Sequence, residues 1–432
     1  MDTYTDYTQH KYVGNITIMR VLILLFLLLS NSQTIVALEH SVTDRHGNEI
    51  SIDINQAMGD MVMIWLLDHD EPRPLFDSLL QQLTDSGIEI WRVDLLDSYY
   101  LPRSSENVRT LDGEGVAAVI QAAHSKTTKK ILLASYDRMP LPLLRGVNRW
   151  QTARKTSRLL GAILFYPNLF GAAPMGGEIP ELDPILHVTN LPLVIYQPEL
   201  GSQRWRLEQM VTALWQAGSP TYVYLVPKAR DWFIMGEGEP DEQEAKMVAR
   251  IPGQLPSLTR LLDSHPKPAA QTPQQPTQIP TGNLYTLTAV DQHKPAPPLR
   301  LADSHDIYLD IEGLDNRVIL VNFWATWCPP CVEEIPSLNR LQAHYKNRDV
   351  SIVSVDFRES TEEIEAFLEE RPVDFPVLMD RDGLTSLAWR VFSFPSSFII
   401  DRQGRVRYTA NKALNWDSDE VIEVIDGLLA EP

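Results

Sequence analysis

A segment rich in proline and glutamine divides this chain of 432 residues. Residues 264–282 read SHPKPAAQTPQQPTQIPTG. Proline removes a backbone donor, and such a composition favours an extended, semi-rigid linker over helix or strand. A single hydrophobic core cannot continue through this segment. The sequence therefore predicts two domains, residues 40–262 and residues 283–432.

The N-terminus carries the pattern of an export signal. Arg20 precedes the apolar run VLILLFLLL, and polar residues follow it. We expect residues 1–37 to be a signal peptide, with Met19 as the biological start because the acidic residues before it do not suit a signal's first region. The run is about half of the roughly 20 residues that a membrane-spanning helix needs, which favours cleavage over the alternative, a permanent anchor. Export predicts a periplasmic protein.

Composition excludes some partners and one source of stability. The formal net charge of −19 argues against binding to nucleic acid or to an anionic membrane surface. The chain has only two cysteines, three positions apart in WCPPC. A pair this close cannot staple a long loop, so stability has to come from hydrophobic cores.

After the linker, short β-branched runs alternate with helical patterns, which favours a thioredoxin-like α/β layer. A helix over 333–345 is expected to place Ile335, Leu338, Leu341 and His344 near one face. Two pairs have capping-box spacing ahead of later helices, Ser360 with Glu363 and Asp417 with Glu420. The expected strands are 318–324, 350–357, 375–380, 396–401 and 406–410.

The cysteines lie where the first of these strands passes into a helix. Cys328 at a helix N-terminus meets unpaired N–H groups and the helix dipole, which favour the reactive thiolate. Cys331, one turn further in, is expected to be buried and able to resolve a mixed disulfide. The prolines between them stiffen the turn. Half of a zinc site and an inert disulfide remain the alternatives.

Residues 283–432 resemble the TlpA/ResA-like branch of the thioredoxin family. The resemblance rests on VNFWATWCPPC, FPVLMDRDG and FPSSFIIDRQGRV. It implies a redox-active Cys328–Cys331 disulfide with no other cofactor and no metal. It also implies a cis peptide bond at Pro395, which leaves backbone groups to pair with a substrate strand. Ser396 replaces the usual threonine.

The same resemblance assigns roles to neighbouring residues. Glu334 would hold or relay a proton for Cys331, with a solvated surface glutamate as the alternative, and Asn322 replaces the buried aspartate of general thioredoxins. The implied partners are disulfide-bearing proteins as substrates and a membrane thiol carrier as electron donor. The implied substrate-binding residues are Trp327, Pro329, Pro330 and Phe394.

Six apolar runs before the linker predict buried parallel strands in a doubly wound α/β sheet. Their order weakly resembles an α/β-hydrolase, but the chemistry of that family is missing. Ser135 is expected to be a loop serine, and Tyr136, Asp137 and Arg138 to resist the positive φ of a nucleophile turn. The runs lie at 61–67, 88–95, 129–135, 161–166, 191–196 and 220–226.

The position of the hydrolase base offers no histidine. Arg230 and Asp231 stand there, and neither is expected to shuttle a proton near neutral pH. Three functions therefore compete: an exported thiol-disulfide oxidoreductase whose first domain binds a partner, a serine hydrolase with an accessory redox domain, and a redox-regulated scaffold. The first is favoured because the residues that carry chemistry all lie in the C-terminal domain.

Overall fold

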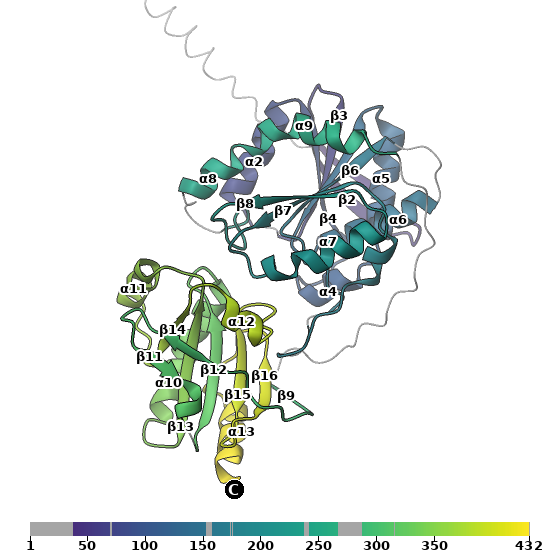
Figure 1. Cartoon of the computed structure of the whole chain (residues 1–432). Helices are drawn as coiled ribbons and strands as arrows, with labels where there is room; N and C mark the ends of the chain where they lie inside the picture. The colour runs from purple at the N-terminus through teal and green to yellow at the C-terminus, as the bar shows by residue number, and fades with distance from the viewer. Residues whose placement is uncertain are drawn as a thin grey trace, which may run out of the picture.

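We describe a computed structural model of the chain, which covers residues 38–431 except 70, 153–157, 173, 175, 237–241, 267–286 and 315. These residues form two α/β domains (Figure 1). The first runs from β1 (Leu38–Thr43) to α9 (Ile251–Asp263), and the second from β9 (Thr288–Ala289) to α13 (Asp419–Ala430). The predicted signal peptide and most of the predicted linker lie outside the described residues.

An eight-stranded sheet forms the centre of the N-terminal domain. Its order is β1-β2-β4-β3-β5-β6-β7-β8, and the strands from β3 onward pair in parallel. Parallel neighbours require crossover connections, which the intervening helices supply. The strands after β1 are β2 (Glu49–Asn55), β3 (Met61–Leu67), β4 (Ile88–Asp94), β5 (Lys130–Tyr136), β6 (Leu159–Phe165), β7 (Leu193–Pro198) and β8 (Thr221–Val226).

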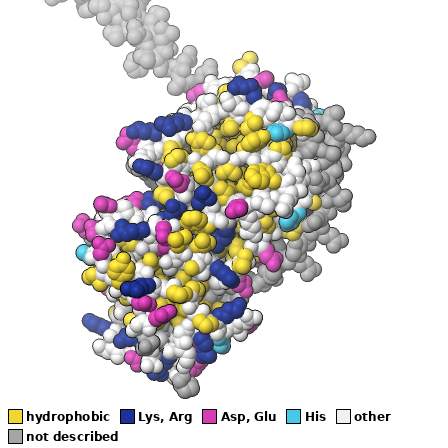
Figure 2. All heavy atoms as spheres, viewed as in Figure 1, with side chains coloured by type: hydrophobic (Ala, Val, Ile, Leu, Met, Phe, Trp, Pro, Cys, Tyr) yellow, Lys and Arg dark blue, Asp and Glu magenta, His cyan; other side chains and the backbone are white. Residues whose placement is uncertain are grey.

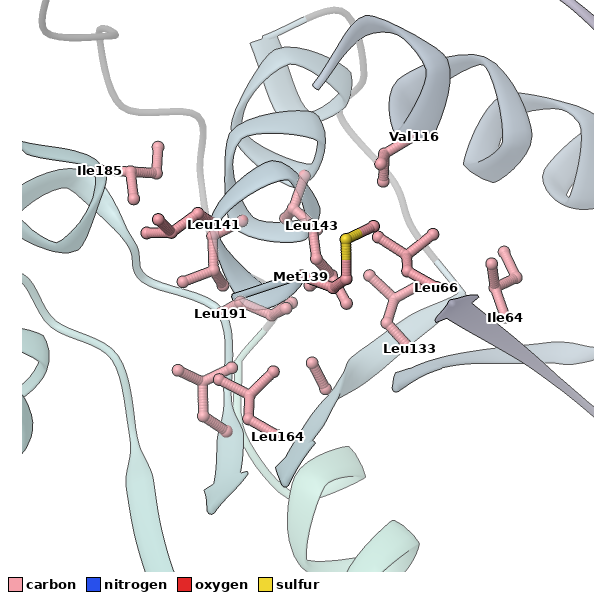
Figure 3. Packing of buried hydrophobic residues seen from close by; sticks show 14 of the residues in the cluster. Ile64, Leu66, Val116, Leu133, Met139, Leu141, Leu143, Leu164, Ile185 and Leu191 are labelled. Atoms are coloured by element: carbon pink, nitrogen blue, oxygen red, sulfur yellow. The ribbon is translucent and has the colours of Figure 1, made fainter. Parts of the chain in front are cut away.

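Helices cover both faces of this sheet, as the doubly wound prediction requires. One core lies under α5, α6 and α7, and the other under α2, α8 and α9. Figure 3 shows the first core, where Met139 and Leu143 pack toward Leu66 and Leu133. The helices are α2 (Pro74–Asp85), α3 (Leu95–Ser98), α4 (Ser105–Thr110), α5 (Glu114–Lys126), α6 (Pro140–Thr152), α7 (Leu207–Gln216) and α8 (Glu242–Val248), with 3-10 turns at Pro184–Val188 and Arg204–Arg206.

All six predicted strands are present, but two further strands were not predicted. β1 and β2 form an antiparallel edge, and β2 pairs antiparallel with β4. Ile50, Ile52 and Ile54 of β2 point inward while the residues between them are more exposed. This alternation is typical of a half-buried antiparallel strand, whereas the prediction relied on continuous apolar runs.

The prediction that β8 is buried is wrong. Val223, Tyr224 and Leu225 expose between 38% and 42% of their surface. β8 is the last strand in the order and pairs with β7 alone among the described strands, so one side of it faces solvent. Figure 2 shows hydrophobic side chains gathered on the visible face of this domain.

A six-stranded sheet with the order β14-β13-β12-β15-β16-β9 forms the C-terminal domain. β12 (Val318–Trp324) lies at its centre, parallel to β13 (Val350–Phe357) and antiparallel to β15 (Ser396–Ile400), and all its residues are buried. Its end therefore delivers the WCPPC segment to the middle of the sheet edge. The other elements are β10 (Arg300–Ala302), β11 (Tyr308–Asp310), a 3-10 turn at Ile311–Gly313, α10 (Pro329–His344), α11 (Thr361–Glu370), β14 (Val377–Asp380), α12 (Leu384–Ala388) and β16 (Val406–Ala410).

Two details of the predicted helices are wrong. His344 is exposed and Tyr345 is buried in its place, because α10 ends at His344 and the chain turns there. The residue that caps α13 is Ser418, and Asp417 instead accepts two hydrogen bonds from Arg340 at 2.6 and 2.9 Å. The capping box at Ser360 is present. Among the described residues, no helix has the length and apolar character that crossing a bilayer requires.

Candidate redox site

The two cysteines form a disulfide at the start of α10. Cys328 is the N-cap residue, and α10 begins at Pro329. Cys331 lies one turn in, with its N–H donating to the Cys328 carbonyl at 3.0 Å and a Cα–Cα distance of 5.3 Å. Both residues are buried, with 4% and 1% of their surface exposed. After reduction, the helix N-terminus would stabilise a thiolate on Cys328.

Glu334 is a buried carboxylic acid on the same helix, with 2% of its surface exposed. Its Oε2 accepts hydrogen bonds from Trp416 Nε1 at 2.8 Å and from the Leu414 N–H at 3.2 Å. Its Oε1 accepts one from Asn322 Nδ2 at 2.7 Å. Burial raises the pKa of Glu334 to about 7, although these hydrogen bonds lower it in part. The alternative of a solvated surface glutamate is therefore wrong, and this acid can exchange a proton near neutral pH.

A cis-proline loop lies against the cysteine segment. The Phe394–Pro395 peptide bond is cis. The Phe394 ring meets Trp327 edge to face at 5.9 Å and Phe357 at 4.8 Å between ring centroids. Trp327 and Phe394 are partly buried, whereas Pro329 and Pro330 are exposed. The two predicted aromatic residues thus lie together, and the two prolines offer an open side of the site.

A pair of acids that the sequence interpretation omitted holds the turn before Cys328. Glu359 accepts from the Thr326 N–H at 2.6 Å and from the Thr326 hydroxyl at 2.5 Å. Its own N–H donates to Asp356 at 3.3 Å, and burial raises the pKa of Asp356 well above its usual range. One signal could have revealed them: β12 and β13 are parallel neighbours, so residues after their carboxyl ends meet at one edge.

The known proteins that resemble this chain match its C-terminal domain, which carries the redox site. The Redoxin family matches residues 291–425. A thiol-disulfide oxidoreductase ResA of Geobacillus kaustophilus is 33% identical over 126 residues, which cover 29% of this chain and 72% of that protein. The chain belongs to the ResA-like thiol-disulfide oxidoreductases through its C-terminal domain.

Two further proteins match this ResA-like domain over a similar share of the present chain. The ResA of Bacillus thuringiensis subsp. konkukian is 32% identical over 113 residues, and the chain spans 65% of the length of that relative and 26% of its own. A solved structure of a thiol:disulfide interchange protein DsbE from Chlorobium tepidum is 29% identical. It covers 33% of this chain and 99% of its own chain, with a TM-score of 0.31.

The carboxyl edge of the N-terminal sheet differs from the prediction in three ways. Ser135 lies within β5, not in a loop, and is fully buried with no hydrogen-bond partner for its Oγ among the described residues. Asp137 adopts φ 48°, because a short polar side chain tolerates the left-handed region. Asp231 can titrate near neutrality, since burial raises its pKa to about 7.

Neither residue at the position of the hydrolase base forms a hydrogen bond with the Ser135 hydroxyl among the described residues. Asp231 accepts a hydrogen bond from the Ser202 N–H at 3.0 Å, and Arg230 reaches across to Glu363 in the C-terminal domain at 2.8 Å. The Ser202 hydroxyl is buried and shares a hydrogen bond of 2.6 Å with the Tyr166 hydroxyl. These residues act as structural contacts in the described arrangement.

Proposed function

We propose that this chain is an exported thiol-disulfide oxidoreductase that reduces protein disulfides in the periplasm through its WCPPC segment. The observation that carries the proposal is the Cys328–Cys331 disulfide at the N-terminus of α10, beside the Phe394 ring that packs against Trp327. The names of the relatives support the same class of reaction. The disulfide itself is the redox group, and the proposal includes no other cofactor and no metal.

The proposed reaction has two exchange steps. The Cys328 thiolate attacks one sulfur of the substrate disulfide, so a mixed disulfide forms and one substrate thiolate leaves. The Cys331 thiolate then attacks Cys328, which closes the Cys328–Cys331 disulfide and releases the second substrate thiolate. Two electrons pass to the substrate, and a dithiol of a membrane electron carrier would return the enzyme to its reduced form.

The second step requires that Cys331 lose a proton while it is buried. An acid that titrates near neutrality on the same helix can receive or return that proton, and Glu334, with a pKa of about 7, meets this requirement. Glu334 lies one helical turn beyond Cys331 in α10. We assign it the role of proton holder in the reducing cycle.

The direction of exchange is tested by a reduction potential. We expect the Cys328–Cys331 couple to equilibrate close to the roughly −270 mV of thioredoxin and far from the roughly −120 mV of strong periplasmic oxidants. Titration of the full chain against glutathione and dithiothreitol buffers measures it, and reduction of insulin by the reduced chain tests turnover. A potential near the oxidant value would reverse the proposed direction, and failure to reduce insulin would favour the scaffold alternative.

The N-terminal domain is proposed to bind a partner, and we expect no ester hydrolysis from the full chain. Ser135 has no described base within hydrogen-bond reach, so its hydroxyl is not activated. Initial rates with p-nitrophenyl acetate and p-nitrophenyl palmitate should match the buffer. Hydrolysis that the Ser135→Ala variant abolishes would instead support the hydrolase alternative.

A further inference from the structure

Loops at the carboxyl edge of the N-terminal sheet contact the C-terminal domain. The loop after β6 accepts a hydrogen bond at Pro174 O from Asn411 Nδ2 at 2.5 Å. The loop after β7 accepts one at Glu199 O from Arg358 Nη1 at 3.0 Å. Open α/β sheets bind their ligands at this edge. In this chain, the C-terminal domain occupies part of it.

Phe392 of the C-terminal domain belongs to the N-terminal core. The residue is 1% exposed and packs with that cluster. Its ring meets Phe170 edge to face at 5.4 Å between centroids, and the Arg206 guanidinium lies 5.4 Å from the Phe392 ring centroid. Edge-to-face aromatic pairs and cation–π contacts add stabilisation beyond the buried area. Phe392 is therefore an anchor between the domains.

Two N-terminal side chains also hold the backbone of this segment. Gln203 Nε2 donates to Phe392 O at 2.8 Å, and Arg206 Nη2 donates to Val391 O at 2.8 Å. Arg206 is 9% exposed and has no ion pair with any carboxylate that the structure describes. A buried cation without a carboxylate is costly, so its hydrogen bond and its ring contact are what offset its burial.

The anchored segment leads directly to the redox site. Phe392 lies three residues before Pro395, and Phe394 between them contacts Trp327, the neighbour of Cys328. The N-terminal domain also holds the loop after β13, on the other side of the cysteine turn. Arg230 donates a hydrogen bond to Arg358 O at 3.2 Å. The next residue, Glu359, accepts the hydrogen bond from the Thr326 N–H. The N-terminal domain thus contacts both loops that border the cysteine turn.

We propose that Arg206 and Gln203 are positioning residues of the redox site, which hold the cis-proline loop in the geometry that pairs with an extended segment of a protein substrate. The inference rests on the proposed reductase function and deepens it. A protein disulfide has to lie along the loop, and a small aromatic disulfide does not. The N-terminal domain therefore contributes to the binding of protein substrates and not to the reactivity of the thiols.

The experiment compares two substrates in the full chain. For Arg206→Met, we expect the KM for insulin to rise about tenfold, as for the loss of a charge-assisted hydrogen bond. For Phe392→Ala, we expect a rise of about the same size, because the ring contacts with Phe170 and Arg206 are lost. The rate at which the reduced variants react with 5,5′-dithiobis(2-nitrobenzoate) should stay within about twofold of the parent, since helix α10 sets the thiolate. Arg206→Lys keeps one donor and should recover most of the loss. Arg204→Met, in the same turn, is the matched control. It should leave unchanged both the KM for insulin and the rate with 5,5′-dithiobis(2-nitrobenzoate).

Hydrogen exchange gives a second measurement that needs no activity. The amides of residues 391–394 and of Ser396 should exchange faster in Arg206→Met than in Arg204→Met, while the rest of the C-terminal domain stays protected. The inference would be overturned if the KM for insulin were unchanged in Arg206→Met and Phe392→Ala. It would also be overturned if these variants lost the same fraction of their rate with insulin and with 5,5′-dithiobis(2-nitrobenzoate). If the parent reduces no insulin at all, the proposed function fails, and the exchange rates of this loop still decide whether Arg206 positions it.

Discussion

Replacement of Cys331 by serine is expected to trap Cys328 in a mixed disulfide with substrate. The variant keeps the nucleophile at the N-cap of α10 but lacks the thiol that closes the second step. Insulin turnover should fall by at least about 1,000-fold, because each molecule reacts once at most. Non-reducing electrophoresis of the reduced variant incubated with insulin should show an adduct that dithiothreitol removes.

Cys328→Ser is the matched control for this experiment. It leaves Cys331 one turn inside α10, away from the helix N-terminus where Cys328 stands, so the remaining thiol has neither the position nor the activation of the nucleophile. We expect equally low turnover but no adduct. Adducts of equal yield in the two variants would show that the assigned roles of nucleophile and resolving thiol are wrong.

Glu334→Gln is expected to remove a large pH dependence from the stability of the C-terminal domain. The pKa of Glu334 is about 7 in the folded protein and 4.5 in its ordinary state, so the folded state binds the proton more tightly. Its contribution is fully present below pH 4.5 and is lost as the pH rises through about 7. The shift corresponds to about 3 kcal/mol at most, and glutamine, which is always neutral, should not show this loss.

Urea unfolding of the oxidised protein at pH 5 and pH 8 measures the effect without titrating thiols. Relative to the parent, Glu334→Gln should gain about 2.5 kcal/mol of stability between these two pH values, because pH 5 already lies above the ordinary pKa of 4.5 and part of the loss has occurred there. The comparison with the parent cancels the contributions of other titrating groups such as Asp231. Glu333→Gln, an exposed neighbour, should show no such gain. If the two variants behave alike, Glu334 is not the titrating group.

The local sequence pattern was sufficient to locate the WCPPC segment and most strands of the two main sheets. Strand runs such as 318–324 and 350–357 agree with β12 and β13, and Cys328 lies at the start of a helix as its neighbours predict. Strand periodicity and helix starts depend on residues close in sequence, so one chain suffices to find them. β1 and β2 were omitted because their signal is alternation and not a continuous apolar run.

The burial and the contacts of a side chain could not be predicted in this way where they depend on residues far away in the sequence. The sequence by itself determined the alternation of helices and strands on both sides of the linker and the position of the cysteines at a helix start. Only the tertiary structure decided that Glu334 is buried, since Trp416, 82 residues away, accounts for one of its hydrogen bonds. It also decided that Phe392 enters the core of the other domain through Phe170 and Arg206. The physical reason is that burial and pKa depend on which remote groups exclude water, and no local pattern encodes that.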